Sequence, residues 1–146
     1  MQGTINAIKQ EVEAFKEKNP KVLFHVDAIQ AYGKYKINPK KEQIDLLSAS
    51  GHKIHGPKGV GFLYIRDKVK VKPLILGGGQ QKDMRSGTEN VPGIVGLGEA
   101  ARCVFENFSE KQKKLYELRE YFVGRLEQME GVKINGFAHC VSEQNL

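Results

Sequence analysis

The sequence predicts an α/β domain in which helices flank a mostly parallel sheet. Apolar runs of strand length alternate along the chain with segments of helical periodicity, which is the pattern of a layered α/β fold. The chain has 146 residues, of which 40% are hydrophobic and 27% charged, and it shows no internal repeat or low-complexity tract. This length and composition fit one ordinary globular domain.

One helix and three strands are expected in the first half of the chain. The helix covers about residues 5–18, because apolar residues recur there at helical spacing and Asn19-Pro20 ends the pattern: Ile5, Ile8, Val12 and Phe15. Strands are predicted over three short runs, at residues 22–26, 44–50 and 60–65. A polar loop over residues 51–59 joins the second strand to the third.

The second half of the chain predicts a loop and two helices. Residues 76–93 are punctuated by glycine and by Pro92, which suits the first turn of a helix over 93–107. Ser109 and Gln112 have the spacing of a capping box, so a long helix is expected to begin there and to end at Gly131. Residues 132–134 are then expected to begin a strand.

Charge and cysteine content narrow the classes of function. The net charge of +6 raises the possibility of nucleic-acid binding, but the basic clusters at 66–72 and 111–114 are not interleaved with aromatic residues. No direct nucleic-acid partner is expected, and binding that depends steeply on salt would indicate otherwise.

No apolar run approaches the ~20 residues that span a bilayer. The N-terminus lacks the pattern of a secretory signal, and two isolated cysteines suggest a reducing compartment, so a cytoplasmic location is expected.

Polar side chains follow the first two predicted strands, where ligands gather in parallel sheets. Asp27 and Gln30 come after the first strand, and Ser50, His52 and Lys53 come after the second. Taken singly, each has an ordinary structural explanation, such as a turn cap or a solvated lysine. Together they suit an aldehyde cofactor that carries a phosphate. The lysine binds the aldehyde, the carboxylate keeps a pyridine nitrogen protonated, and short polar groups and backbone amides hold the phosphate.

Three motifs in order carry a resemblance to a known family: HVDAIQA at 25–31, SGHKIHGPKG at 50–59 and RSGTEN at 85–90. They resemble the NifS/IscS-type cysteine desulfurases, which belong to the class V aminotransferase superfamily of fold-type I enzymes that use pyridoxal 5'-phosphate (PLP). The resemblance extends over nearly all of the chain. It implies a partial PLP-dependent transferase large domain. By this resemblance, residues 1–131 would be the second half of the PLP-binding large domain, and residues 132–146 the truncated beginning of the small C-terminal domain.

The resemblance also implies a role for each site residue. Lys53 would bind PLP covalently and move protons, with His52 beside it in the catalytic site. Asp27 would pair with the pyridine nitrogen and Gln30 would hydrogen-bond the phenolic oxygen of the ring. Ser50 and His52 would contact the phosphate, and no metal is implied. Thr88 would reach the phosphate bound in the neighbouring subunit, so a homodimer is implied.

The implied reaction converts L-cysteine to L-alanine and transfers the sulfur to an enzyme cysteine. The sulfur then goes to an iron–sulfur scaffold or another acceptor protein, for iron–sulfur cluster assembly or tRNA thiolation. Family members are much longer than this chain and carry the catalytic cysteine on a loop beyond the matching region. The chain is therefore expected to be a fragment that holds the cofactor lysine and is inactive alone. Cys103, expected to be a small buried residue in a helix, and Cys140 are not expected to replace that nucleophile.

Two alternatives stay open. A related PLP enzyme, either a selenocysteine lyase or an aminotransferase, shares the same lysine loop, although residues 85–90 speak against it. A non-catalytic remnant that dimerises through uncovered apolar faces is the alternative of a different class.

Overall fold

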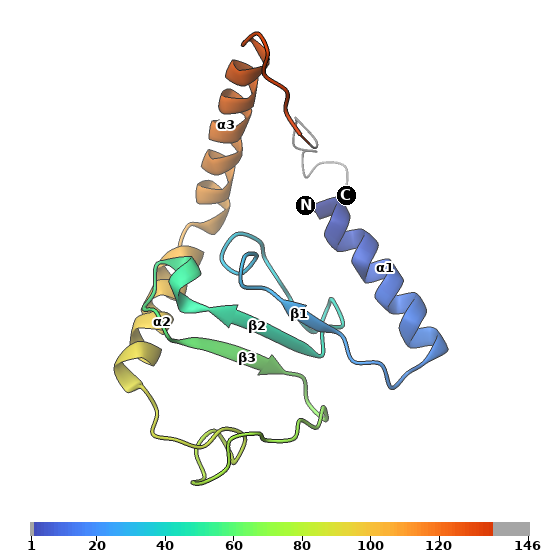
Figure 1. Ribbon diagram of the computed structural model, residues 1–146, viewed down its shortest axis with the longest axis vertical. Helices are drawn as coiled ribbons and strands as arrows, with labels where there is room; N and C mark the ends of the chain where they lie inside the picture. The colour runs from blue at the N-terminus through green and yellow to red at the C-terminus, as the bar shows by residue number, and fades with distance from the viewer. Residues whose placement is uncertain (1, 136–146) are drawn as a thin grey trace. The chain divides into compact units, whose positions relative to one another are not determined.

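The computed structural model describes residues 2–135, with side chains from Gln10 onward. The elements in chain order, shown in Figure 1, are α1 (Gln2–Lys18), β1 (His25–Asp27), β2 (Leu46–Ser50), the 3₁₀ helix η1 (Gly51–Ile54), β3 (Gly61–Ile65), α2 (Val91–Phe105) and α3 (Phe108–Glu127). The α/β class is confirmed. The chain divides into two compact units between Val104 and Phe105.

The three strands of the first unit form one sheet in the order β1-β2-β3. β1 pairs with β2 in parallel, with Asp27 opposite Ser48. β2 pairs with β3 antiparallel, with Ser50 opposite Gly61. The sheet is therefore mixed where a mostly parallel one was expected. The short connection between β2 and β3 requires this, because a parallel pair needs a crossover of a dozen residues or more.

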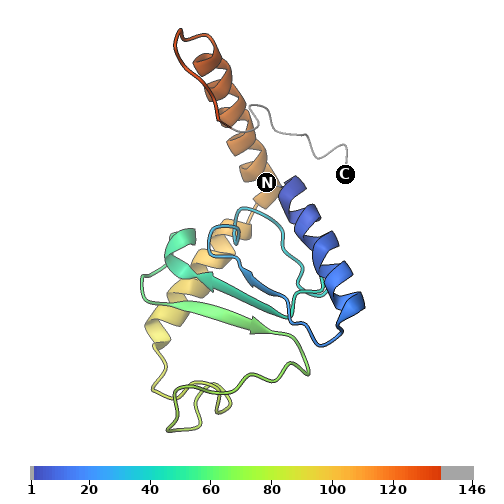
Figure 2. The same ribbon diagram turned by 45° about the vertical axis from the view of Figure 1, so that its right-hand side comes forward.

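One face of the sheet is covered by the segment between β1 and β2. The core of buried residues consists of Ala28, Ile44, Leu47 and Ala49. Half-buried side chains pack around it, from the strands, from the residue before β1 and from the connecting segment: Phe24, Val26, Ala31, Tyr32, Ile37 and Tyr64. Tyr32 also meets the ring of Phe62 edge-on at 5.1 Å between centroids. Figure 2 shows this segment, in light blue to teal, looping away from the strands and back.

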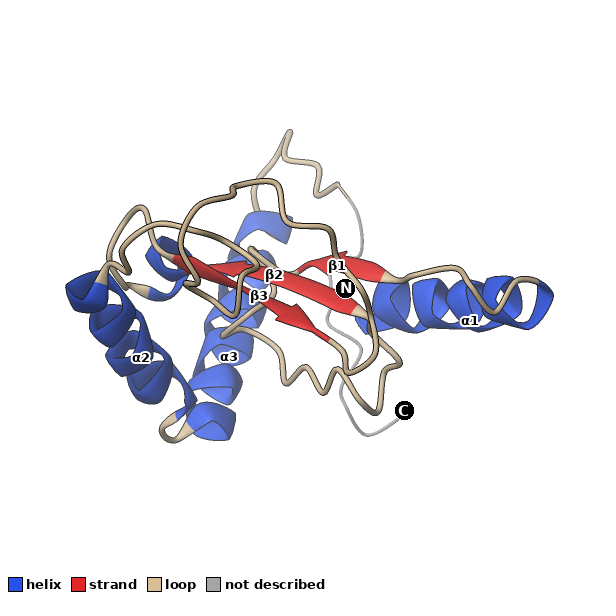
Figure 3. Ribbon diagram, turned by 90° about the horizontal axis from the view of Figure 1, so that it is seen from below, coloured by secondary structure: helices blue, strands red, loops and turns tan. Residues whose placement is uncertain are grey.

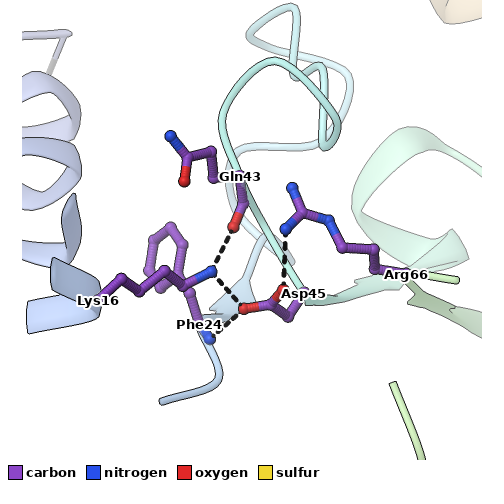
Figure 4. Close-up of polar contacts among 5 residues, drawn as sticks. All are labelled: Lys16, Phe24, Gln43, Asp45 and Arg66. Atoms are coloured by element: carbon purple, nitrogen blue, oxygen red, sulfur yellow. Dashed lines mark hydrogen bonds and ion pairs between the residues drawn. The ribbon is translucent and has the colours of Figure 1, made fainter. Parts of the chain in front are cut away.

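The amino end of β2 is fixed by a buried ion network, drawn in Figure 4. Asp45 is only 4% exposed, and its two oxygens meet Lys16 Nζ at 2.6 Å and Arg66 Nη1 at 3.1 Å. The Phe24 N–H donates to the same carboxylate at 2.8 Å, and Lys16 also donates to the Gln43 carbonyl. The network therefore ties α1 and the residue after β3 to the start of β2.

Burial by itself raises the pKa of the Asp45 carboxyl. The hydrogen bonds from Lys16 and the Phe24 N–H, with the charges of Lys16 and Arg66, outweigh that effect and hold the pKa below its usual range. Asp45 is thus an ionised, fully partnered buried carboxylate.

Two long loops make up much of the first unit, shown in tan around the red strands in Figure 3. One joins β1 to β2, and the other runs from Arg66 to α2. Pro92 is the second residue of α2, in agreement with the expected first-turn position.

The second unit differs from the prediction at both ends of its helix. α3 begins at Phe108, with Asn107 at the N-cap in a left-handed conformation (φ 52°, ψ 35°), so Ser109 lies inside the first turn and the predicted capping box is wrong. Phe108 is buried and stacks on Phe105, with centroids 5.5 Å apart, so an aromatic contact accompanies this start. Residues 132–134 are not a strand, and Val132 is 42% exposed. A strand needs a neighbour for its backbone hydrogen bonds, which a short run with strand propensity does not supply by itself.

Within residues 2–135, no helix combines the length and the apolarity that crossing a membrane requires.

Candidate functional site

The predicted site residues lie where β1 and β2 end. Because these strands are parallel, their carboxyl ends meet at one edge of the sheet, with Asp27 closing β1 and Ser50 closing β2. Gly51–Ile54 continues from Ser50 as η1, the short teal turn beyond β2 in Figure 1. Asp27, Ser50, His52 and Lys53 are thereby brought to one edge, as the sequence predicted.

The β1 side of this edge supplies a carboxylate and an amide. Asp27 is exposed, and one of its oxygens accepts the Ile29 N–H at 3.0 Å. This contact fixes the turn after β1, in which Ala31 and Tyr32 donate backbone N–H groups to the Ala28 carbonyl. Gln30 is exposed in the same turn, and its side-chain oxygen accepts a long hydrogen bond from Lys34 at 3.4 Å.

The β2 side supplies a hydroxyl, an imidazole and an amine. Ser50 Oγ lies 2.7 Å from His52 Nδ1, so this hydrogen bond fixes the orientation of the ring. His52 and Lys53 are both exposed, within a 3₁₀ turn whose Gly51 and Ile54 are buried. Lys53 therefore extends from a turn with a buried base, and its amine is open to a ligand.

The loop that follows Lys53 is held tightly against the sheet and α2. The Gly51 N–H donates to the Val60 carbonyl and the Gly56 N–H donates to the Gly51 carbonyl, both at 2.9 Å. α2 approaches this loop at Gly96, where an added Cβ would lie 2.7 Å from Pro57 Cγ. Only glycine permits so close an approach of the helix. The loop that carries Lys53 is thus rigidly supported.

Thr88 lies apart from this edge along the chain, exposed in the loop before α2. Ser86, two residues earlier, is buried, and the Ser86 hydroxyl donates to the Gly78 carbonyl at 2.7 Å. Asn90 caps α2, since its side-chain oxygen accepts the Gly93 N–H at 3.1 Å.

Sequence reasoning missed two residues beside the site. His25 Nε2 lies 3.2 Å from Ser48 Oγ, and Ser48 is the register partner of Asp27. The signal was present in the alternation of polar residues along each strand, since positions two apart share a face. His25 and Asp27 on β1, and Ser48 and Ser50 on β2, lie on the face of the sheet opposite the core. They share that face with apolar residues of β2 and β3: Leu46, Leu63 and Ile65.

The prediction that Cys103 is buried is wrong. α2 turns Gly96, Ala100 and Val104 toward the loop and toward Gly33, and this face leaves Cys103 exposed. Its thiol donates to Glu99 Oε1 at 3.4 Å. Cys140 lies outside the described residues.

The Glu99 carboxylate that accepts the Cys103 thiol is itself strongly stabilised. Hydrogen bonds from Arg102, and then from Cys103, lower the pKa of Glu99 to about 2. Glu99, Arg102 and Cys103 thus hydrogen-bond one another along α2.

The residues at the sheet edge fit PLP in their chemistry. An exposed amine, a carboxylate, an amide, a hydroxyl and an imidazole stand at one edge on a buried base. The Ser50 hydroxyl and the His52 ring, already 2.7 Å apart, suit a phosphate oxygen. A carboxylate suits a protonated pyridine nitrogen.

Comparison with known proteins agrees with this chemistry. The family model described as aminotransferase class-V matches residues 1–145. A curated relative, cysteine desulfurase IscS of Clostridium botulinum, is 50% identical over 135 residues, which is 92% of this chain and 34% of that protein.

Solved structures give the same result. A NifS-like protein matches with a TM-score of 0.77 and 46% identity, over 82% of this chain and 33% of its own. A NifS-like protein from Rickettsia africae matches with a TM-score of 0.78 and 36% identity, over 86% of this chain and 35% of its own. This chain thus spans about a third of the length of the proteins it matches.

Proposed function

Since the chain belongs to the aminotransferase class-V family, we propose that it forms the cofactor-binding part of a PLP-dependent cysteine desulfurase. The observation that carries this proposal is the position of Lys53. It lies in η1, three residues after the end of β2, at the edge where Asp27 ends the parallel neighbour β1. Motif order and chain-wide similarity to cysteine desulfurases support the same assignment.

Lys53 is the residue that binds the aldehyde of PLP and later exchanges a proton with the bound substrate. PLP, when bound, supplies an electron sink that stabilises negative charge at the substrate carbon. Asp27 pairs with the pyridine nitrogen and keeps it protonated. Gln30 donates to the phenolic oxygen.

Ser50 and His52 hold the phosphate, and the hydrogen bond between them sets both groups before the ligand arrives. Thr88 binds the phosphate held by a second copy of the chain, so the functional form is a homodimer. Each site then draws residues from both subunits.

The substrate of the complete site is L-cysteine, and the products are L-alanine and sulfur carried on an enzyme cysteine. The acceptor is an iron–sulfur scaffold or another sulfur-accepting protein in the cytoplasm. By comparison with the complete enzyme, we assign residues 1–131 to the second half of the PLP-binding large domain and residues 132–146 to the start of the small domain. The residues described here supply the PLP side of the reaction, so the 146-residue chain releases no sulfur from cysteine by itself.

The test is covalent capture of PLP at Lys53. The chain is mixed with PLP, reduced with borohydride and digested, and the modified peptide is identified by mass spectrometry. A single modified site at Lys53 is expected, and Lys53→Ala abolishes it. Lys58→Ala is the matched control, because Lys58 is also exposed in the same loop. Equal labelling of Lys53 and Lys58, or labelling spread over surface lysines, would contradict the proposal.

A further inference from the structure

Ser86 is a buried polar residue near the end of the loop that leads to α2, with exposed residues on both sides. It is 6% exposed, while Arg85, Gly87 and Thr88 around it are exposed. Its N–H donates to the Ile75 carbonyl at 3.1 Å and its hydroxyl donates to the Gly78 carbonyl at 2.7 Å. Both donors of Ser86 thus hold the outgoing arm of the loop, residues 85–90, against the incoming arm, residues 75–81.

Two further contacts tie the residues on either side of Thr88 to the incoming arm. The Gly87 N–H donates to Gln80 Oε1 at 3.1 Å, and Gln81 Nε2 donates to Glu89 Oε1 at 3.0 Å. Gly87 has a φ of 117°, a conformation that glycine alone adopts without strain. We call this set the Ser86 clasp: Ser86 with Ile75 and Gly78, Gly87 with Gln80, and Glu89 with Gln81.

The far end of the loop is fixed by α2. Asn90 accepts the Gly93 N–H on its side chain at 3.1 Å and the Ile94 N–H on its carbonyl at 2.9 Å. Thr88 is therefore bracketed by the clasp on one side and by a helix cap on the other, and it remains exposed. A loop tied on both sides of one exposed hydroxyl presents that hydroxyl in a defined position.

We propose that Ser86 is a positioning residue that pre-orders Thr88 for the phosphate of PLP bound in a second copy of the chain. This inference rests on the proposed function, which gives Thr88 its ligand. Ordering a loop on binding costs conformational entropy, so a loop ordered in advance binds more tightly. Ser86 acts only through Thr88 and does not touch the ligand.

The experiment is a double-mutant cycle on the whole chain, read out as the affinity for PLP captured at Lys53. Ser86→Ala weakens this affinity about fivefold to tenfold. Thr88→Val weakens it about tenfold, because the loss of one hydrogen bond to a charged group costs about that factor in affinity. The double variant S86A/T88V binds PLP at most about twofold more weakly than T88V, because the effects of substitutions at coupled residues are not additive. Amide hydrogen exchange at residues 86–89 becomes faster in S86A in the absence of PLP.

Two further variants keep the result interpretable. Lys82→Ala, an exposed residue of the same loop, leaves both affinity and exchange unchanged. Gln80→Ala removes only the acceptor of the Gly87 N–H, and it reproduces part of the S86A effect even where S86A itself folds poorly.

Additive effects of S86A and T88V, or an affinity that neither variant changes, would contradict the positioning role while leaving capture at Lys53 intact. A wild-type chain that captures no PLP at Lys53 would contradict the proposed function, and this inference with it.

Discussion

The two ends of β2 use charged residues in opposite ways. At the amino end, the Asp45 carboxylate is buried and meets Lys16, Arg66 and a backbone N–H. At the carboxyl end, Lys53 and Asp27 are exposed, and in the described part of the chain neither forms an ion pair. Removing one partner from a buried, paired charge destabilises the fold, because the other charge is left uncompensated. Charges that gather exposed at a strand end remain available to a ligand.

The largest effect is expected at the amino end. Asp45→Ala leaves Lys16 and Arg66 half-buried without their counterion, and we expect it to lower the free energy of unfolding by about 3 kcal/mol. Urea denaturation followed by circular dichroism measures this. Asp67→Ala, which changes an exposed aspartate, serves as control and costs less than about 0.5 kcal/mol. Equal losses of unfolding free energy in Asp45→Ala and Asp67→Ala would contradict the stabilising role given to the amino end of β2.

The same network predicts the pH dependence of stability. The pKa of folded Asp45 lies below the usual value of 3.8, so the unfolded chain takes up a proton at this position first as the pH falls. The stabilisation from Asp45 is therefore complete above about pH 5 and is lost as the pH drops through the folded pKa. The difference in unfolding free energy between wild type and D45A should be constant from pH 5 to 7 and should shrink below about pH 4. A difference that grows on acidification would mean that the pKa of Asp45 is raised.

A smaller effect, on ligand binding, is expected at the carboxyl end. His52→Ala removes the ring that Ser50 orients, and it should lower the affinity for PLP about tenfold, or about 1.4 kcal/mol. Its free energy of unfolding should change by less than about 0.5 kcal/mol, because His52 is exposed. His55→Ala, an exposed histidine just after η1, is the matched control for affinity. A large loss of stability in H52A would give His52 a structural role instead.

The carboxyl end was more predictable from sequence than the amino end, for a physical reason. Asp27 directly follows one apolar run and Lys53 lies in the loop after another, so local pattern placed both at strand ends, and parallel pairing put these ends at one edge of the sheet. The Asp45 network joins residues 29 and 21 positions apart, and local pattern carries no information about such partners. One signal was present, since an aspartate inside the apolar run of residues 44–47 needs a partner when that run is buried.

The packed face of α2 and the absence of a strand at residues 132–134 were also beyond prediction from sequence. α2 is apolar on several sides, with Val91, Ile94 and Val95 exposed, so periodicity could not tell which face packs and Cys103 was misplaced. The triplet at 132–134 has strand propensity, but a strand also requires a neighbour to pair with.

The most direct test of the account is thermal unfolding of three proteins with and without PLP: wild type, Lys53→Ala and Lys16→Met. PLP should raise the Tm of wild type, since a ligand that binds only the folded state stabilises it. Lys53→Ala should keep the Tm of the free wild-type chain and lose the rise, whereas Lys16→Met should have a lower Tm and keep the rise. A rise that survives in Lys53→Ala and disappears in Lys16→Met would contradict the assignment of ligand binding to the carboxyl end of β2 and of stability to its amino end.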